Sequence, residues 1–355
     1  MTNQLYLVVM AGGSGTRFWP KSTSKKPKQL LGFGAQSSTT LLTDTLSRFD
    51  GVVPADQRMI VTTELLSHAV KDQTTGVKIL AEPQGRNTAP CVYWAASEVA
   101  AIDPKAVMLV MPSDHYFSQP ELFRNSVRAA ALWASEHDDL VTLGVKPSRP
   151  ETGYGYLKTG SAAGKSAASL SGCLKVESFV EKPNLKKAEE FVRAGNYLWN
   201  GGMFLWRAEV ILKAFDQFMP EMKKIWDEHR GDVTSAYPKL TATSIDYGVM
   251  EKATNVVTFT LDCGWDDLGS WTSLEGLSDV LNARKLGSTV TGGDLVAVES
   301  SGCIVDVRGK LVALLDVNDL IIVESGDALL IAHKNRAQDI KLVVEQVKKI
   351  RPDLA

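Results

Sequence analysis

The sequence predicts an α/β protein with one large, mostly parallel β-sheet and a small β-rich domain at its carboxyl end. Over the first 145 residues, short apolar runs alternate with segments of helical spacing, a pattern typical of parallel strands joined by helices. After about residue 285, short apolar runs follow one another without helices between them, which indicates a separate β-domain. We therefore expect one domain over residues 1–280 and a smaller one over residues 285–355 that closes with a helix.

The elements follow from the positions of the apolar residues. In the first half of the large domain, strands are expected at Leu5–Met10, Arg58–Thr62, Val77–Ala81, Ala106–Met111 and Leu140–Val145, with helices between them at residues 40–49, 64–71, 88–102 and 121–136. In its second half, strands are expected at Cys173–Val180, Asn200–Trp206 and Val256–Leu261, and helices at Lys186–Ala194, Ala208–Phe215 and Pro220–Glu228. The small domain has predicted strands at Leu295–Val298, Cys303–Val307, Leu311–Leu315, Leu320–Val323 and Ala328–Ile331, and a helix at Ala337–Ile350.

Composition argues against several kinds of partner. The net charge is −2, so no global field attracts nucleic acid or anionic lipid. No apolar run approaches the ~20 residues that span a bilayer, and the amino terminus lacks the pattern of a secretory signal. The four cysteines stand far apart, without metal-site or disulfide spacing. We therefore expect a cytoplasmic protein.

A glycine-rich loop followed by cations comes directly after the first predicted strand. Gly12, Gly13 and Gly15 let the backbone turn sharply and bring N–H groups against a ligand. No Asp or Glu precedes Asp44, whereas five cations follow the glycines: Arg17, Lys21, Lys25, Lys26 and Lys28. The spacing fits neither a P-loop nor a dinucleotide fingerprint. A flexible loop with this excess of positive charge suits a triphosphate, so the chain is predicted to bind a nucleotide.

This segment, residues 12–30, resembles the signature of the sugar-phosphate nucleotidyltransferases, and we call it the signature segment. Within that family it is most similar to the mannose-1-phosphate guanylyltransferases. Five further stretches match in the expected order, at residues 82–90, 112–115, 179–183, 199–204 and 265–269. The resemblance therefore spans nearly the whole chain.

The resemblance implies a Rossmann-like nucleotidyltransferase (GT-A-like) fold with a mixed, mostly parallel sheet. It also implies a small left-handed β-helix-like domain that takes part in contacts of a homodimer. The implied reaction converts GTP and α-D-mannose 1-phosphate into GDP-mannose and diphosphate. Longer members of the family carry an isomerase domain, which we do not expect within these 355 residues.

The chemistry requires that two phosphate anions be neutralised and aligned. The attacking phosphate is already an oxyanion, so no general base or covalent intermediate is needed. We expect the nucleotide to contact the loop and its cations: Ala11, Gly12, Gly13, Ser14, Gly15, Thr16, Arg17 and Lys28.

Two aspartates are the candidate ligands of a divalent cation, expected to be Mg²⁺. Asp114 follows a buried strand and is also expected to contact the nucleotide, although Ser-Asp-His after a strand also occurs at helix caps. The second carboxylate is Asp266 or Asp267, and the family pattern selects Asp267. The alternative role for Asp266 is to cap or support it.

The sugar phosphate is expected to bind near Lys182, which ends a predicted strand before a proline. The resemblance implies that Lys182 holds the phosphate and that Glu181 accepts hydrogen bonds from sugar hydroxyls. Gly153 and Asn200 lie in turns expected to contact the sugar.

Recognition of guanine is expected between residues 82 and 90. A carboxylate can accept from the N1 and N2 donors of guanine, so Glu82, Arg86 and Asn87 are candidates, although Asn87 is equally explained as a helix cap. The same chemistry with UTP or dTTP and a glucose-type phosphate is the nearest alternative. A non-catalytic sensor of nucleotide sugars is a second alternative, but such a sensor has no need of two metal-binding acids.

Overall fold

The computed structural model describes residues 4–13, 15–33, 39–164, 172–229, 232–277, 284–285 and 288–355. The chain divides into two compact units. The first unit contains Met1–Gly12, Arg48–Pro112 and Gln119–Trp265, and the second contains Gly13–Ser47, Ser113–Ser118 and Asp266–Ala355.

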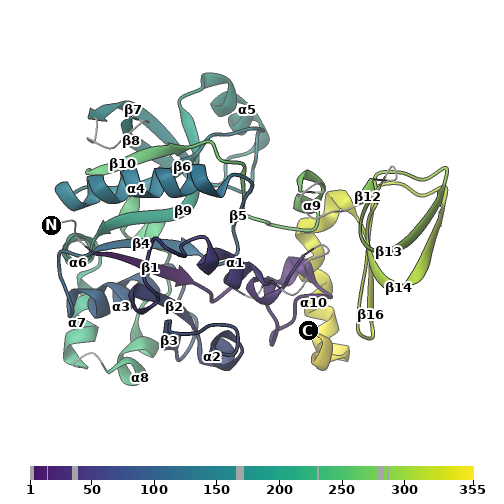
Figure 1. The fold of residues 1–355 in the computed structure, drawn as a ribbon, viewed down its shortest axis with the longest axis horizontal. Coiled ribbons are helices and arrows are strands. Elements are labelled where there is room, and N and C mark those ends of the chain that lie inside the picture. The colour runs from purple at the N-terminus through teal and green to yellow at the C-terminus, as the bar shows by residue number, and fades with distance from the viewer. Residues whose placement is uncertain are drawn as a thin grey trace. The chain divides into compact units, whose positions relative to one another are not determined.

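A nine-stranded sheet forms the centre of the first unit, in the order β3-β2-β1-β4-β9-β6-β10-β8-β7 (Figure 1). Strands β3, β2, β1 and β4 are parallel, and so are β6 and β10. Strand β9 runs antiparallel to both β4 and β6, so the sheet is mixed, with its parallel part around β1. The bounds are β1 Leu5–Met10, β2 Arg58–Thr63, β3 Lys78–Glu82, β4 Val107–Pro112, β6 Leu140–Val145, β7 Tyr156–Gly164, β8 Cys173–Val180, β9 Tyr197–Arg207 and β10 Val256–Leu261.

Helices cover both faces of this sheet, which is why the neighbouring strands β1 and β4 are apolar along nearly their whole length. Tyr6 and Val8 of β1 pack in the cluster that includes α3 (Thr88–Ala100) and α6 (Ala208–Phe218), while α4 lies over the other face (Figure 1). None of the described helices is long and apolar enough to cross a membrane. The other helices are α2 Glu64–Lys71, α4 Pro120–Glu136, α5 Leu185–Ala194, α7 Pro220–Glu228, α8 Val233–Ala236 and a π-helical turn at Asp246–Met250.

The second unit contains a five-stranded sheet in the order β12-β13-β14-β15-β16. The pairs β13–β14 and β14–β15 are parallel, and the two outer pairs are antiparallel. The bounds are β12 Arg284–Lys285, β13 Thr289–Val298, β14 Ile304–Leu315, β15 Leu320–Ser325 and β16 Ala328–His333, with β5 at Tyr116–Phe117 and helices α1 Leu41–Ser47, α9 Ser273–Gly276 and α10 Ile340–Ile350. Strand β11, Trp265–Asp266, begins at the last residue of the first unit and ends at the residue where the second unit resumes.

Two strands predicted separately, at residues 303–307 and 311–315, are one strand, β14. Its partner β13 makes a bulge at Gly293, where the register shifts and φ is 85°. A Cβ at Gly293 would lie only 1.7 Å from the carbonyl oxygen of Val307. The bulge therefore lets both strands continue past the turn residues that suggested an end.

The expected boundary near residue 280 does not coincide with the division into compact units. The signature segment belongs to the second unit from Gly13 onward. Phe18 and Trp19 are buried in the same hydrophobic cluster as Trp271 and Ile340, and the Trp19 indole N–H donates to the carbonyl of Leu354 at 2.8 Å. Burial of these aromatic side chains groups the signature segment with carboxyl-terminal residues. Sequence spacing carries no information about so distant a contact.

Candidate active site

The glycine loop begins where β1 ends. The sequence predicts that this loop binds the nucleotide. Ala11 continues the strand in the first unit: its N–H donates to Val61 O at 2.8 Å, and its carbonyl accepts from Thr62 Oγ1 at 2.9 Å. Gly12 and Gly13 are exposed, and a Cβ at Gly13 would meet no atom within 4 Å. Ser14 lies outside the described residues. The two glycines thus leave the backbone open to a ligand.

The second unit has two 3₁₀ turns, Thr16–Phe18 and Lys28–Leu30, and Nζ of Lys28 lies 5.8 Å from the centroid of the Phe18 ring. Gly15 has a φ of 59°, and a Cβ there would lie 2.3 Å from Cβ of Lys28. The hydroxyl of Ser22 donates to the carbonyl of Gly15 at 2.7 Å. Glycine is required at position 15 both for the left-handed backbone and for the close approach of Lys28.

Lys28 connects both predicted acidic positions. Its ammonium pairs with Oδ2 of Asp114 at 2.8 Å and donates to the main-chain carbonyl of Asp267. Lys28 is buried, so this charge is held in place rather than solvated. The three predicted residues are therefore brought together within one unit, from segments far apart in the sequence.

The electrostatics of Asp114 favour its carboxylate form. Burial acts to raise the pKa of Asp114, but the nearby charges of Lys28 and His115 and the hydrogen bonds that Asp114 accepts outweigh burial and lower the pKa. Asp114 consequently presents an anion in a cationic setting, as an oxygen ligand for a divalent cation requires.

Asp266 and Asp267 have different surroundings. Oδ1 of Asp266 accepts from the N–H of Leu268 at 2.7 Å, so Asp266 supports the turn, one of the two roles left open from sequence. A Cβ at Gly269 would lie 3.0 Å from Oδ1 of Asp267, so the glycine leaves room for that carboxylate. Among the described residues, no three His, Cys, Asp or Glu side chains gather as a metal site. Two carboxylates still fit Mg²⁺, which takes its other ligands from phosphate and water.

The other cations of the signature segment lie in other surroundings. Arg17 is exposed on its 3₁₀ turn. Lys21 forms an ion pair with the buried Asp306 of β14. Lys26 is exposed and its N–H donates to Thr23 Oγ1 at 3.2 Å. Among these described cations, Lys28 is the one that contacts Asp114 and Asp267.

The first unit holds the residues predicted to read the base. Glu82 ends β3 and is buried, where it accepts a hydrogen bond from the hydroxyl of Tyr237. Burial raises the pKa of Glu82 to about 7, although the hydrogen bond from Tyr237 acts to lower it. A Cβ at Gly12 would lie 3.4 Å from Oε2 of Glu82, so this carboxyl group lies beside the start of the loop.

Arg86 and Asn87 serve the local fold in this structure. Arg86 donates to the carbonyl of Pro238. Asn87 is the N-cap of α3, and its Oδ1 accepts from Thr88 N at 2.8 Å. Its φ of 65° and ψ of −169° place it in a strained backbone region that residues other than glycine rarely adopt. The capping role left open from sequence is therefore the one that the structure records for Asn87.

Residues predicted to bind the sugar phosphate gather elsewhere in the first unit. Glu181 and Lys182 are exposed and form an ion pair. Lys182 has a φ of 39°, a backbone strain that recurs at functional sites. A Cβ at Gly155 would lie 2.9 Å from Oε2 of Glu181 and 3.6 Å from Cβ of Asn200. Gly153 lies close in sequence, and its N–H donates to Oε1 of Glu151 at 3.0 Å.

Two residues of the site escaped the sequence analysis. Asp246 accepts from Nδ2 of Asn200 at 2.6 Å and so fixes the amide. Burial raises the pKa of Asp246, while the hydrogen bond from Asn200 acts to lower it. Tyr237 is the partner of Glu82. The only sequence signal for either was a polar group beside apolar residues, which is too common to be diagnostic.

These features define the chain's class. A mixed α/β sheet, an open glycine loop after its first strand and a buried lysine held against an aspartate are features of a phosphate-handling transferase. Residues 6–283 match the nucleotidyl transferase family, and residues 293–347 match the MannoseP isomerase/GMP-like beta-helix domain. The chain belongs to the nucleotidyl transferase family.

Relatives and solved structures cover nearly the whole chain. Alginate biosynthesis protein AlgA of Pseudomonas aeruginosa is 37% identical over 365 residues, covering 96% of this chain and 71% of the relative. Mannose-1-phosphate guanylyltransferase of Escherichia coli is 36% identical over 363 residues, covering 98% of this chain and 74% of the relative. A crystal structure from Thermus thermophilus, described as a mannose-1-phosphate geranyltransferase, has a TM-score of 0.86 and 32% identity and covers 97% of this chain and 99% of its own.

Proposed function

We propose that the chain transfers a guanylyl group from GTP to α-D-mannose 1-phosphate and releases diphosphate and GDP-mannose. The observation that carries the proposal is the position of Lys28, whose buried ammonium contacts Asp114 and the main chain of Asp267 beside the glycine loop. The E. coli and T. thermophilus relatives support the choice of mannose 1-phosphate through their names.

The proposed roles follow from charge. Arg17, Lys28 and the amides of the signature segment neutralise the triphosphate, so that the α-phosphorus can be attacked by another anion. Lys182 binds the phosphate of mannose 1-phosphate. Glu181 accepts hydrogen bonds from the sugar hydroxyls, and Asn200 both accepts and donates them. The attacking oxygen is ionised near neutral pH, so these side chains align and neutralise but need not remove a proton.

Asp114 and Asp267 are the residues that would hold a divalent cation, which we propose to be Mg²⁺. When bound, such a cation supplies positive charge to the phosphates of the nucleotide. The lowered pKa of Asp114 supports this assignment, because a protonated carboxyl group would be a poor ligand.

Glu82 is the proposed guanine-reading residue. Its buried carboxyl group lies beside Gly12 and in its anionic form can accept from two donors on one edge of guanine. A pyrimidine triphosphate such as UTP or dTTP lacks this pair of donors, so Glu82 favours GTP over the pyrimidine alternatives.

We further propose that the protein is a cytoplasmic homodimer. Large apolar side chains on β13, β14 and β16 are 48–71% exposed, and a group of this kind is unusual on a monomer's surface. They are Val296, Val298, Leu311, Leu315, Leu329 and Ile331. Light scattering of the wild type and of Leu315→Lys tests the dimer, which the lysine should dissociate.

The cytoplasmic location is supported by the cysteines. All four are free and buried, as suits a reducing compartment.

A screen of diphosphate release tests the reaction. Four nucleoside triphosphates are each combined with mannose 1-phosphate and with glucose 1-phosphate, with Mg²⁺ or with a chelator. We expect release to be fastest with GTP, mannose 1-phosphate and Mg²⁺, and to stop with the chelator. Faster release with UTP or dTTP would favour the alternative substrates. Binding of GDP-mannose without any release would favour the sensor.

A further inference from the structure

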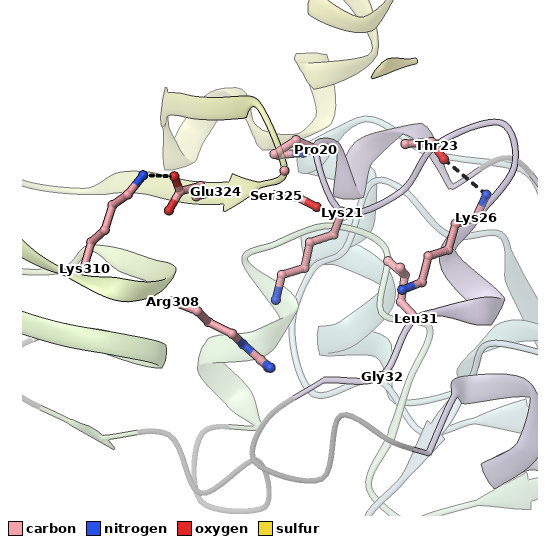
Figure 2. A pocket seen from close by; sticks show the side chains of 11 residues that line it. Pro20, Lys21, Thr23, Lys26, Leu31, Gly32, Arg308, Lys310, Glu324 and Ser325 are labelled. Carbon is pink, nitrogen blue, oxygen red and sulfur yellow. Dashed lines mark hydrogen bonds and ion pairs between the residues drawn. The ribbon is translucent and has the colours of Figure 1, made fainter. Parts of the chain in front are cut away.

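A cationic cavity lies within the second unit, and it is lined by side chains that the proposed reaction does not use. Its volume is about 610 Å³, within the range that holds a small-molecule ligand. One wall comes from the signature segment and the residues that follow it, including Lys21, Lys26 and Leu31, and the other from β14 and β15, including Arg308 and Lys310. Figure 2 shows the side chains of Lys21 and Arg308 extending from these two walls toward the same space.

Ion pairs fix two of the cations at the cavity wall. Lys21 pairs with Asp306, which is 2% exposed, and Lys310 pairs with Glu324 of β15 (Figure 2). The other oxygen of Asp306, Oδ1, is buried without a hydrogen-bond partner in the described part of the chain. A buried pair left incompletely satisfied adds little to stability, so its clearer consequence is to hold the Lys21 ammonium at the cavity.

The positively charged side chains that line the cavity repel one another. Burial lowers the pKa of Lys21, the ion pair with Asp306 opposes that effect, and the charges of Arg308 and Lys26 lower the pKa further. Lys26 lies on the same wall as Lys21, and Arg308 lies on the opposite wall. Both are close enough to repel the ammonium group of Lys21. A bound anion would relieve this repulsion.

We propose that this cavity is a second anion site that binds a phosphorylated small molecule, separate from the nucleotide site at Lys28 and Asp114. Four cations and one carboxylate line it, and Asp306 adds a second carboxylate behind Lys21. The cations therefore outnumber the carboxylates, as binding of a diphosphate group requires. Ser325 and Thr23 add hydroxyl groups, while Pro20 and Leu31 are the only larger apolar lining residues. Charge and hydrogen bonding, rather than apolar contact, therefore define the ligand.

The nucleotide site and the cavity use different members of the same cation series. Lys28 faces Asp114, whereas Lys21 faces Asp306 on β14. The two sites can therefore be separated by mutation, because Lys26 and Arg308 line the cavity whereas Lys28 pairs with Asp114.

Calorimetric titration with inorganic diphosphate in metal-free buffer tests the proposal on the full chain. The cavity variant is Lys26→Gln/Arg308→Gln. The matched control is Lys341→Gln/Lys348→Gln, which removes the same charge from exposed positions on α10 of the same unit. A third variant, Lys28→Ala, removes the cation of the nucleotide site. Circular dichroism shows whether each variant is folded.

We expect a diphosphate-binding event in the wild type, the control and Lys28→Ala, and an affinity at least about tenfold lower in the cavity variant. Arg308→Lys, which keeps the charge, should retain most of the binding. Displacement by GDP or by a hexose phosphate then distinguishes a nucleotide from a sugar phosphate as the natural source. Identical titrations of the cavity variant and the control would overturn the proposal, and so would loss of the event in Lys28→Ala. These outcomes do not depend on turnover, so the proposed reaction can fail without affecting them.

Discussion

A Cβ at Gly15 would lie 2.3 Å from Cβ and 2.7 Å from N of Lys28, so these two residues meet at a distance that only glycine allows. The contact joins the glycine loop to the lysine that binds Asp114. Because Lys28 is buried, it cannot move aside freely to admit a larger residue at position 15. Gly15 and Lys28 therefore pack together, and a change at position 15 acts directly on this lysine.

Gly15→Ala should displace Lys28 and lower turnover by at least about tenfold, which corresponds to about 1.4 kcal/mol. The left-handed backbone at Gly15 should also cost the variant about 1–2 kcal/mol of stability. Gly276→Ala is the control, since a Cβ there meets nothing within 4 Å and Gly276, on α9, lies outside the proposed nucleotide site. Steady-state rates of diphosphate release and thermal unfolding measure both effects. Equal rates in the two variants would contradict the packing argument.

Lys28→Ala, Asp114→Ala and Asp267→Ala should each lower turnover by at least about tenfold with the fold intact. Lys28→Ala has a second consequence, because the Lys28 charge is the strongest influence that lowers the pKa of Asp114. In that variant the pKa of Asp114 should rise, which NMR titration of the carboxyl group can measure. Near-normal turnover in all three variants would mean that the site lies elsewhere.

Lys182→Ala should raise the KM for mannose 1-phosphate by at least about tenfold and change the KM for GTP much less, because Lys182 is assigned to the sugar phosphate alone. Lys175→Ala is the matched control, since Lys175 is an exposed lysine on β8, the strand that ends two residues before Lys182. Initial rates at varied concentrations of each substrate separate the two constants. An equal rise in both constants would count against the assignment.

Glu82→Gln should change how stability depends on pH. Burial raises the pKa of Glu82 from 4.5 to about 7, so the folded chain holds this proton more tightly than the unfolded chain. Wild-type stability from this group is fully present below the unfolded pKa and is lost as the pH rises through about 7, by about 3 kcal/mol in total. The variant lacks this loss, so its Tm should exceed that of the wild type at about pH 8 and approach it near pH 4.5.

Glu64→Gln, which removes an exposed carboxylate on α2, is the control for this comparison. Its Tm should follow the wild type across the same range. Parallel curves for all three proteins would show that folding does not raise the pKa of Glu82.

The sequence was sufficient where function depends on local pattern. Strand β1 and the glycine loop follow directly from apolar spacing and from glycine's conformational freedom. Asp114 was identifiable because it follows a buried strand, at the edge where α/β sheets bind ligands. Lys182 required the family resemblance, since a lysine at a strand end is by itself an ordinary solvated residue.

The sequence by itself therefore determined the fold class and the loop, and it selected Asp114 and Asp267 as candidate acids. Only the tertiary structure decided which acid Lys21 and Lys28 each meet, because sequence spacing carries no information about these long-range pairs. One meets Asp306 and the other meets Asp114. It also decided the partners Tyr237 and Asp246, which lie 155 and 46 residues from Glu82 and Asn200. Burial and hydrogen bonding between distant segments depend on how the chain packs, and no local pattern records them.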